Sequence, residues 1–550
     1  MVVPEPLAPV QTQPPQDGSF GSETPASAPQ PSSPRLASPL LRELQAQRAV
    51  QNSPGAALEL TSHTLTLPTY DRSTLTGGIT HIGVGGFHRA HLALYLDDLA
   101  QAGSSTWSIT GSGVTAHDTR IASVLSEQDG LYLLAEREGE QVDGRLIGSL
   151  TNFLPAQHDP APLLANLADP NTRILSLTIT EGAFPVEHGS FVESEALALD
   201  VRSESPSGTF GLIVEALDRR RKAGLAPFTV LCCDNLPGNG NVARTAVLGA
   251  AALRSEELAA WLHRNGAFPN AMVDRITPQT TDAERTWAAK TFGFTDSWPV
   301  VCEPFRQWAL EDHFVESPSL QSRPAFELAG VLMTSDVLPY EHMKLRLLNG
   351  SHSALAYHAA LAGIQYVHDA TLNPPIQRFI RSLMKDEAVK TLSVAPAGID
   401  LDEYQESLVR RFSNPAIADT ISRLCLDGTG KFPTFVVSSL EAQLASGGEI
   451  RMLTLAIAGW CRYLQGVADD GSALVLSGDP FLAEATSFAL RSKTDPTAFL
   501  HYERALGPNL ASSVRLGEVF TEALNELDTF GSLGTLDRWT AQFTGKVTQA

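Results

Sequence analysis

The sequence predicts an α/β protein with an N-terminal domain built on a parallel sheet and a second, mostly α-helical domain. Continuous apolar runs alternate with amphipathic helical patterns between residues 77 and 236, which is typical of a parallel sheet covered on both faces. A glycine-rich turn joins the first apolar run to the helical pattern that follows it. After about residue 298 the strand patterns fade and helical periodicity dominates. The chain has 550 residues, which is long enough for two domains.

The first 55 residues differ in composition from the rest. They hold 11 of the 35 prolines, with many serines, glutamines and alanines. Such a segment buries too little apolar surface to offset the entropy lost on ordering. We therefore predict a disordered tail over residues 1–55, with a short helix around residues 40–50, and regard it as a dispensable extension rather than a binding segment.

The predicted elements of the two domains follow in chain order. Residues 56–295 form the first domain, with strands at 77–85, 107–113, 173–180 and 228–236 and helices at 89–101 and 211–224. Two further strands, at 131–138 and 145–153, are expected to lie antiparallel at an edge. Residues 296–550 form the second domain, with helical patterns at 342–364, 374–391, 435–465, 479–491 and 513–528.

Composition excludes several classes of partner and site. The formal net charge of −21 argues against nucleic acid or an anionic membrane as a partner. No apolar run is long enough to span a membrane, and no targeting segment is readable. The five cysteines are sparse and form no CxxC pair, and no compact His/Cys cluster favours a catalytic zinc. A cytoplasmic protein without a metal is expected.

The segment "HIGVGGFHRAH", residues 81–91, has the context of a dinucleotide-binding turn, because a strand ends, glycines follow and a helix starts. Gly83 permits the tight turn, Gly85 lets the backbone approach a pyrophosphate, and the helix N-terminus faces the negative charge. His88 stands where the GxGxxG pattern needs a glycine, so a purely structural turn is the alternative. The candidate cofactor-binding residues here are His81, Ile82, Gly83, Val84, Gly85, Gly86, Phe87, His88, Arg89, Ala90 and His91.

Cofactor preference depends on the end of the second strand, where an acidic residue binds the adenosine ribose of NAD. Residues 114–116 are not acidic, and Asp118 is the nearest carboxylate. Asp118 is therefore either a ribose ligand or a helix cap. NAD is favoured and NADP stays open.

Two more polar segments follow apolar runs. Asp234 and Asn235 end a strand in "CCDNLPGNG", at the sheet edge where open α/β sheets bind ligands. Asn235 could donate a hydrogen bond to a developing oxyanion, or the segment is simply a turn of Asn, Pro and Gly. Asp274 and Arg275 lie in the apolar run "MVDRITPQT", as a buried salt bridge or, for Asp274, as a ligand contact.

The helical stretch "EHMKLRLLNGSHSALAYH", residues 341–358, carries polar side chains on one face. At roughly 100° per residue, Glu341, Lys344, Asn349 and His352 fall within an arc of about 140°. A partly buried lysine has a lowered pKa and can take a proton from an alcohol. Asn349 can donate to the oxyanion, His352 can hold a hydroxyl, and Glu341 can relay the proton. These roles suit hydride transfer from a secondary alcohol.

The motifs, taken together, resemble the mannitol dehydrogenase family of polyol-specific long-chain dehydrogenase/reductases, closest to its mannitol 2-dehydrogenase branch. The matching segments are collinear over about residues 78–365: "HIGVGGFHRAHLALYLDDL", "SLTITEG", "CDNLPGNG", "FPNAMVDRITP", "WPVVCEPFRQWALED" and "KLRLLNGSHSALAY". The resemblance implies a Rossmann-type domain, a helical domain and an active site in the cleft between them. It also implies a monomer that reversibly oxidises D-mannitol to D-fructose with NAD and without zinc.

The resemblance further implies residue roles. Lys344 is the general acid/base, Asn235 and Asn349 form the oxyanion hole, His352 binds substrate, and Glu341 belongs to a proton path. Asp274, Arg423 and Lys431 are carried over as substrate-binding residues. D-Arabinitol dehydrogenase and hexuronate reductase activities stay open, as do a catalytically inactive cofactor-sensing protein and a scaffold that uses its proline-rich tail. The long tail and the missing acidic residue after the second strand depart from the family pattern.

Overall fold

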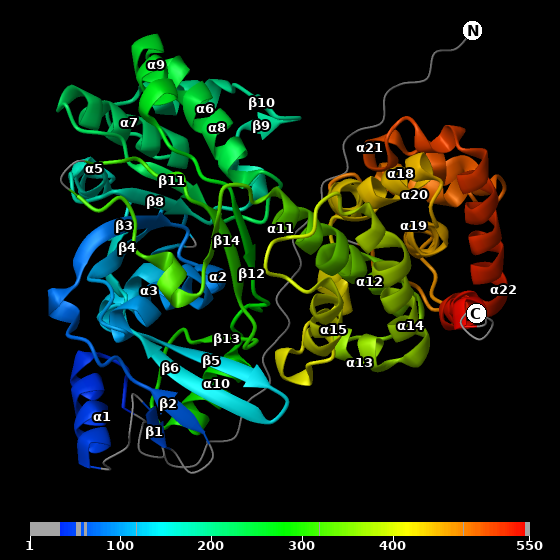
Figure 1. Cartoon of the computed structure of the whole chain (residues 1–550), viewed down its shortest axis with the longest axis horizontal. Helices are drawn as coiled ribbons and strands as arrows, with labels where there is room; N and C mark the ends of the chain where they lie inside the picture. The colour runs from blue at the N-terminus through cyan, green and yellow to red at the C-terminus, as the bar shows by residue number, and fades with distance from the viewer. Residues whose placement is uncertain are drawn as a thin grey trace, which may run out of the picture.

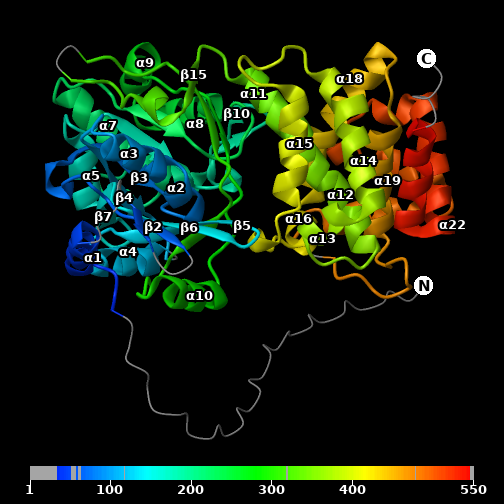
Figure 2. The same ribbon diagram turned by 60° about the horizontal axis from the view of Figure 1, so that its bottom comes forward.

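The chain forms two lobes that lie side by side, one built on sheets and one made of helices (Figure 1). The computed structural model describes residues 34–50, 57–59, 63–116, 118–317, 320–476 and 478–544. Figure 2 shows the same two lobes from a second direction. The predicted fold class is confirmed. No helix within the described residues has both the length and the apolar character needed to cross a membrane.

The sheet lobe is organised around a five-stranded parallel sheet in the order β11-β8-β3-β4-β7. Its strands are β3 (Thr76–Ile82), β4 (Trp107–Gly113), β7 (Leu150–Pro155), β8 (Ile174–Leu177) and β11 (Thr229–Cys232). Side chains of successive residues enter different cores: Ile174 packs in one cluster with α3 (Leu92–Gln101), and Leu175 packs in another with α7 (Thr209–Lys222). Helices therefore cover both faces, which explains why the strands read as continuous apolar runs.

The edge strands differ from the prediction. Residues 145–153 do not form one strand, because Gly148 and Ser149 separate β6 (Gln141–Ile147) from β7. β7 is a parallel edge strand of the main sheet. β6 pairs antiparallel with β5 (Tyr132–Glu138) in a second sheet of order β1-β2-β6-β5-β13. That sheet also contains β1 (Ala57–Glu59), β2 (Thr64–Thr66) and β13 (Val300–Cys302).

The expectation that strands end at about residue 298 was wrong. β13 pairs with β5, and β14 (Gln307–Glu311) pairs with β12 (Ala271–Asp274) and β15 (Leu332–Thr334). These three late strands are only three to five residues long, too short to show a strand periodicity. They pair with the sheet lobe, so we propose that the first domain extends through β15 rather than ending at residue 295.

Part of the predicted tail belongs to the fold. The helix expected around residues 40–50 is α1 (Ser38–Val50), and Leu36, Leu40 and Leu41 are buried against the second sheet. The backbone amide of Leu36 donates to Thr295 O at 2.9 Å, which anchors the start of the segment. The expected short helix is therefore present, but residues 34–39 also belong to the fold and not to a disordered tail. The average composition of 55 residues hides three leucines at helical spacing. Residues 1–33 and 51–56 lie outside the described residues.

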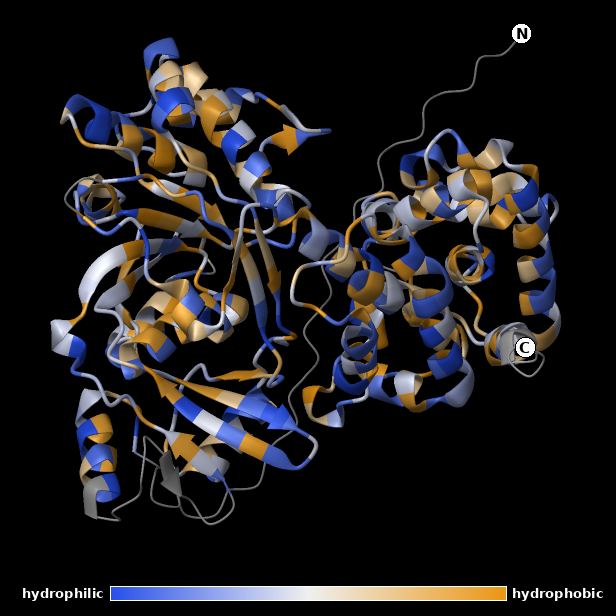
Figure 3. Ribbon diagram, in the orientation of Figure 1, coloured by the Kyte–Doolittle hydropathy of each residue, from blue (hydrophilic) through white to orange (hydrophobic). Residues whose placement is uncertain are grey.

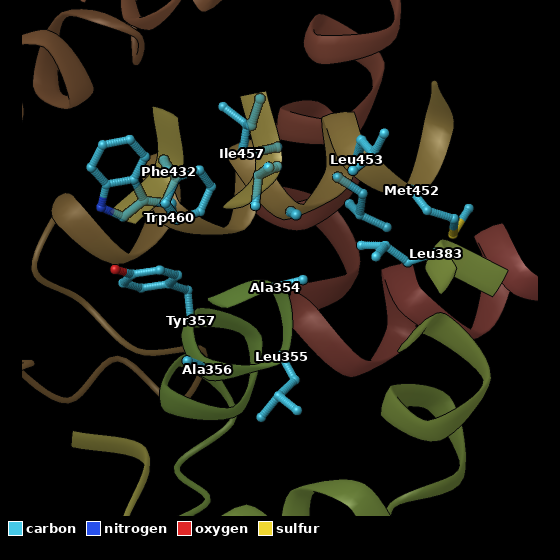
Figure 4. Close-up of a cluster of buried hydrophobic side chains, with 14 of the residues drawn as sticks. Ala354, Leu355, Ala356, Tyr357, Leu383, Phe432, Met452, Leu453, Ile457 and Trp460 are labelled. Carbon is cyan, nitrogen blue, oxygen red and sulfur yellow. The ribbon is translucent and has the colours of Figure 1, made fainter. Parts of the chain in front are cut away.

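The second lobe is helical, and each of the five predicted helical ranges contains helices. Its centre is the contact between α12 (Gly350–Leu361) and α19 (Arg451–Leu464). Figure 4 shows this core, with Tyr357 and Leu355 on α12 and Ile457 and Trp460 on α19. Its surrounding helices carry both hydrophobic and hydrophilic residues, as amphipathic helices around a buried core do (Figure 3). The start of α12 adjoins the segment that contains Lys344.

Candidate active site

The segment Lys344–Asn349 is a π-helical turn between α11 (Leu338–Met343) and α12. A π-helix bonds residue i to i+5, so Lys344 and Asn349 come to the same face. In an α-helix they would lie roughly 140° apart. The predicted α-helical arc therefore has the wrong local geometry, although Lys344, Asn349 and His352 do line one cavity. Single π turns inside helices are frequent at functional sites.

Gly350 closes this turn and permits a close approach. A Cβ at Gly350 would lie 2.8 Å from the carbonyl oxygen of Phe435, which belongs to a second π-helical segment, Pro433–Val437. Only glycine leaves room for that backbone contact. The two π segments therefore pack directly against each other beneath the site.

Lys344 is 6% exposed, and its ammonium donates a hydrogen bond to Asn235 Oδ1 from the opposite lobe. Burial lowers the pKa of Lys344 below its ordinary value, although the nearby carboxylates of Asp274 and Glu341 oppose this shift. The neutral amine is thus reached at a lower pH than for an exposed lysine. A group of this kind suits proton transfer.

Glu341 lies one turn before Lys344, outside the main cavity. Its Oε2 accepts a hydrogen bond from the Gly238 amide at 2.9 Å, and burial raises the pKa of its carboxyl. Glu341 and Lys344 both line a small cavity of about 10 Å³ behind the site. That volume is close to the room that one water molecule needs.

Asn349 and His352 also line the site, and each has a buried polar atom. Neither Asn349 Oδ1 nor His352 Nε2 has a hydrogen-bond partner among the residues that the structure describes, although both atoms are buried. The His352 ring stacks on Phe412 at 3.9 Å between centroids, and burial lowers the pKa of His352 to about 3. His352 is therefore a neutral imidazole near pH 7. Unsatisfied buried atoms of this kind call for a ligand or a water.

A cavity of about 750 Å³ lies at this point, lined by residues from both lobes. The sheet lobe contributes Asn235, Asp274 and Glu181. Asn235 follows the end of β11, Asp274 is the last residue of β12, and Glu181 follows the end of β8. The helical lobe contributes Lys344, Asn349 and His352. Ligands of open α/β sheets bind at this edge. The cavity has the volume of a small-molecule site.

The three predicted substrate-binding residues also line the cavity, and each has a protein partner. Asp274 accepts two hydrogen bonds from Arg411, at 2.8 and 2.9 Å. Arg423 pairs with Asp419, with Nε donating to Oδ1 at 2.6 Å. Lys431 Nζ donates to the Leu424 carbonyl at 3.2 Å, and burial lowers its pKa.

Sequence reasoning missed Arg411, Asp419 and Glu181. Arg411 had a readable signal, because it lies on the apolar face of its helix, α15 (Leu401–Phe412), between Leu408 and Phe412. A charge on an apolar face predicts a buried partner. Glu181 begins the short 3-10 helix Glu181–Ala183 and Asp419 lies in a loop, so neither carried such a signal.

The glycine turn has the backbone that a dinucleotide-binding turn needs. Gly83 has φ +96°, and a Cβ there would lie 2.0 Å from Thr178 O. Only glycine is tolerated at such a position. Gly85 is exposed and precedes the short helix α2 (Gly86–Ala90), so its backbone can be approached closely. This arrangement at the carboxyl end of β3 fits a bound pyrophosphate.

Most other candidates in this segment face the protein interior. His81 hydrogen-bonds Ser176 Oγ through Nδ1 at 2.8 Å, and His88 stacks on it at 3.4 Å. Arg89 donates to the Trp298 carbonyl, and His91 Nε2 bonds the Gln307 carbonyl at 3.1 Å. Ile82, Val84 and Ala90 are buried, and Phe87 is half-buried. Contact with a cofactor from this segment would therefore come chiefly from its backbone at Gly85 and Gly86.

Asp118 begins α4 (Asp118–Glu127), and its carboxylate turns back onto the preceding loop. Oδ2 accepts from the amide and the hydroxyl of Thr115, at 2.8 and 2.7 Å. Both bonds run to the loop before the helix, so they close that loop rather than cap the helix in the predicted way. A ribose contact by Asp118 stays a proposal.

Comparisons with known proteins agree with this architecture. The profile of the mannitol dehydrogenase Rossmann domain matches residues 77–322, and that of the mannitol dehydrogenase C-terminal domain matches residues 336–528. Mannitol 2-dehydrogenase of Cereibacter sphaeroides is 43% identical over 484 residues, covering 87% of this chain and 100% of the relative. Mannitol 2-dehydrogenase of Pyrenophora tritici-repentis is 40% identical, covering 88% and 87%.

Two solved structures have the same fold. One is the mannitol 2-dehydrogenase of Pseudomonas fluorescens in a ternary complex with NAD and D-mannitol, with a TM-score of 0.78, 39% identity and coverage of 92% of this chain and 99% of that one. The other is a D-sorbitol dehydrogenase in substrate-free form, with a TM-score of 0.79, 34% identity and coverage of 87% and 98%.

The dinucleotide-binding sheet lobe, the helical lobe and the buried lysine–asparagine pair in the cavity between them define a two-domain oxidoreductase. The chain belongs to the mannitol dehydrogenase family.

Proposed function

We propose that this protein reversibly oxidises D-mannitol to D-fructose with NAD, by lysine acid/base catalysis and without a metal. The observation that carries the proposal is the buried Lys344 amine, hydrogen-bonded across the lobes to Asn235 and lying in one cavity with Asn349. The relative from Pseudomonas fluorescens, solved with NAD and D-mannitol, supports the choice of substrate and cofactor.

When bound, NAD would supply the acceptor for the hydride of the carbinol carbon. The Gly83–Gly86 turn would hold its pyrophosphate, because Gly83 makes the turn and Gly85 leaves the backbone open. Asp118 is the proposed ribose contact on the neighbouring strand end. To bind the ribose, its carboxylate would either keep its bonds to Thr115 or exchange them for bonds to the ribose hydroxyls.

The proton of the reacting hydroxyl goes to Lys344. In oxidation the neutral amine accepts it, and in reduction the ammonium returns a proton to the carbonyl oxygen. Asn235 keeps Lys344 in place through Oδ1, which leaves its amide N–H groups for the substrate oxygen. Asn349 supplies the second donor. Two amide groups can therefore donate hydrogen bonds to that oxygen as negative charge develops on it. Glu341, across the small cavity, would pass the proton outward through a water.

The rest of the cavity would hold the polyol chain. The neutral His352 ring can donate or accept a hydroxyl hydrogen bond through Nε2, which lacks a protein partner among the described residues. Asp274 can accept hydrogen bonds from the substrate hydroxyls, and Lys431 and Arg423 can donate to them. Hydroxyl-rich substrates satisfy such a mixed donor and acceptor lining. Monomeric state and cytoplasmic location stay predictions.

A substrate panel tests the proposal. Initial rates should be measured with NAD and NADP, using D-mannitol, D-sorbitol and D-arabinitol in oxidation and D-fructose and fructuronate in reduction. We expect the highest kcat/KM for mannitol with NAD. Because oxidation of mannitol or sorbitol at C2 gives fructose, the polyol formed from fructose and NADH must also be identified, and we expect mannitol.

The outcomes separate the alternatives. Sorbitol as the product, in line with the second structural relative, would replace mannitol with its C2 epimer as the substrate. Turnover of arabinitol or fructuronate with no fructose reduction would favour the two other predicted activities. NADH binding without any turnover would favour a cofactor-sensing protein.

A further inference from the structure

Arg411, on the helical lobe, joins two buried carboxylates of the sheet lobe. Its Nη1 and Nη2 donate to the two oxygens of Asp274 at 2.8 and 2.9 Å. Its Nε and Nη2 donate to the two oxygens of Glu303 at 2.9 and 2.8 Å. All three side chains are at least 90% buried. Planar, bidentate pairing of this kind fixes orientation as well as distance.

An aromatic ring also packs against the flat face of the Arg411 guanidinium. The guanidinium lies 3.9 Å from the ring centroid of Phe305, which comes from the loop between β13 and β14. A stacked arginine with two bidentate partners has little freedom to move. Arg411 itself lies behind Asp274 and is not part of the cavity lining, whereas Asp274 is.

Arg411 therefore fixes the orientation of the Asp274 carboxylate from the side away from the cavity. Both of its oxygens accept from Arg411, so the carboxyl group cannot rotate without breaking a buried charge-assisted bond. Each oxygen keeps acceptor capacity for a group in the cavity. The position of Asp274 in the sheet lobe is thus set by a residue of the helical lobe.

The end of α15 reaches the site at a second point. Phe412, the residue after Arg411, stacks on His352. Two residues further, Asn414 accepts from the Gly139 amide at 3.1 Å and donates to the Arg137 carbonyl at 2.8 Å, both on the β5–β6 hairpin. Residues 411–414 thus contact the sheet lobe through Arg411 and Asn414, and they contact two proposed substrate ligands, Asp274 and His352.

We propose that Arg411 is a positioning residue that joins docking of the two lobes to polyol binding, by holding Asp274 in its substrate-binding orientation. It acts through Asp274 and does not touch the substrate. The inference rests on the proposed role of Asp274 as a substrate ligand.

The first experiment compares Arg411→Lys with Arg410→Lys. Arg410 is a matched control, because it precedes Arg411 on the same helix but is exposed and pairs with Glu403 at the surface. Lysine keeps the charge at 411 but loses the planar fork. We expect Arg411→Lys to raise KM for mannitol at least about tenfold, as for the loss of one charge-assisted hydrogen bond. KM for NAD should not change, and Arg410→Lys should behave as wild type.

The second experiment is a double-mutant cycle with Asp274→Asn. If Arg411 acts through Asp274, the double variant should have the same KM for mannitol as Asp274→Asn alone. Multiplicative effects of the two changes would overturn the inference, because they would mean independent roles. A purely structural role would lower the melting temperature and the active fraction while leaving KM for mannitol unchanged.

Phe305→Leu covers the case in which Arg411→Lys does not fold, because it removes no charge and only frees the guanidinium face. It should raise KM for mannitol about threefold, a factor in the range of a cation–π contact, and this rise should vanish in the Asp274→Asn background. A wild-type KM in Phe305→Leu, or a rise that persists in the Asp274→Asn background, would count against the inference.

Failure of the inference can be told apart from failure of the proposed function. If wild-type protein turns over no polyol, the proposed function fails. If it turns over mannitol and Arg411→Lys has the same KM, only the inference fails.

Discussion

Replacement of Lys344 by alanine is expected to lower kcat about 10²- to 10⁴-fold, for mannitol oxidation and fructose reduction alike. The alanine removes the amine that takes the proton in one direction and returns it in the other. Both directions pass through the same transition state, so neither is spared. Initial rates in each direction measure the effect.

The binding of NADH should survive in Lys344→Ala. The glycine turn at Gly83 belongs to the sheet lobe, whereas Lys344 lies on the π turn of the helical lobe. Fluorescence titration of NADH checks this, and Lys290→Ala, at an exposed position on α10 (Asp282–Phe292), controls for the loss of a lysine elsewhere. Near-normal rates in Lys344→Ala would remove Lys344 from the mechanism.

Replacement of Asn349 by alanine should have the second-largest effect. Loss of one preorganised donor to an oxyanion typically lowers kcat about 10²- to 10³-fold. Asn349→Asp should be worse than Asn349→Ala, because a carboxylate would repel the negative charge that develops on the substrate oxygen. The order of kcat among wild type, Asn349→Ala and Asn349→Asp is the measurement.

Asn525→Ala, at an exposed position on α22 (Val514–Thr544), is the matched control for Asn349→Ala and should leave kcat unchanged. Equal rates for Asn349→Ala and Asn349→Asp would mean that the amide does not face the reacting oxygen. A change confined to KM would instead assign Asn349 to ground-state binding.

The parallel sheet was predictable because its strands are buried on both faces and leave continuous apolar runs, as in Ile174–Leu177. The late strands were not, because a three-residue strand such as Val300–Cys302 has no periodicity to detect. It is specified by its pairing with β5, a contact distant in sequence. Similarly, α1 is stabilised by packing against the second sheet rather than by the composition of its neighbourhood.

For the site, the sequence located the polar face of residues 341–352 but not the π turn, which depends on the close approach of Phe435 to Gly350. It grouped His81 and His88 with the cofactor, whereas the structure buries both. A strand–turn–helix motif shows where a ligand lies but not which side chains turn inward. The apolar face of its helix marks Arg411 as buried, but its partners, Asp274 and Glu303, are more than 100 residues away and could not be read from the sequence.

The central claim is that Lys344 exchanges the proton. Burial lowers the pKa of Lys344, and oxidation needs the neutral amine, so kcat/KM for mannitol should rise with pH and level off above that pKa. Reduction needs the ammonium, so kcat/KM for fructose should fall through the same range.

The most direct test is the pH dependence of kcat/KM for mannitol in wild type and in Lys344→Ala. The mechanism predicts an inflection below the pKa of an ordinary lysine in the wild type, and a residual rate in Lys344→Ala that lacks this inflection. The same inflection in both proteins would contradict it, because another group would then be the proton acceptor.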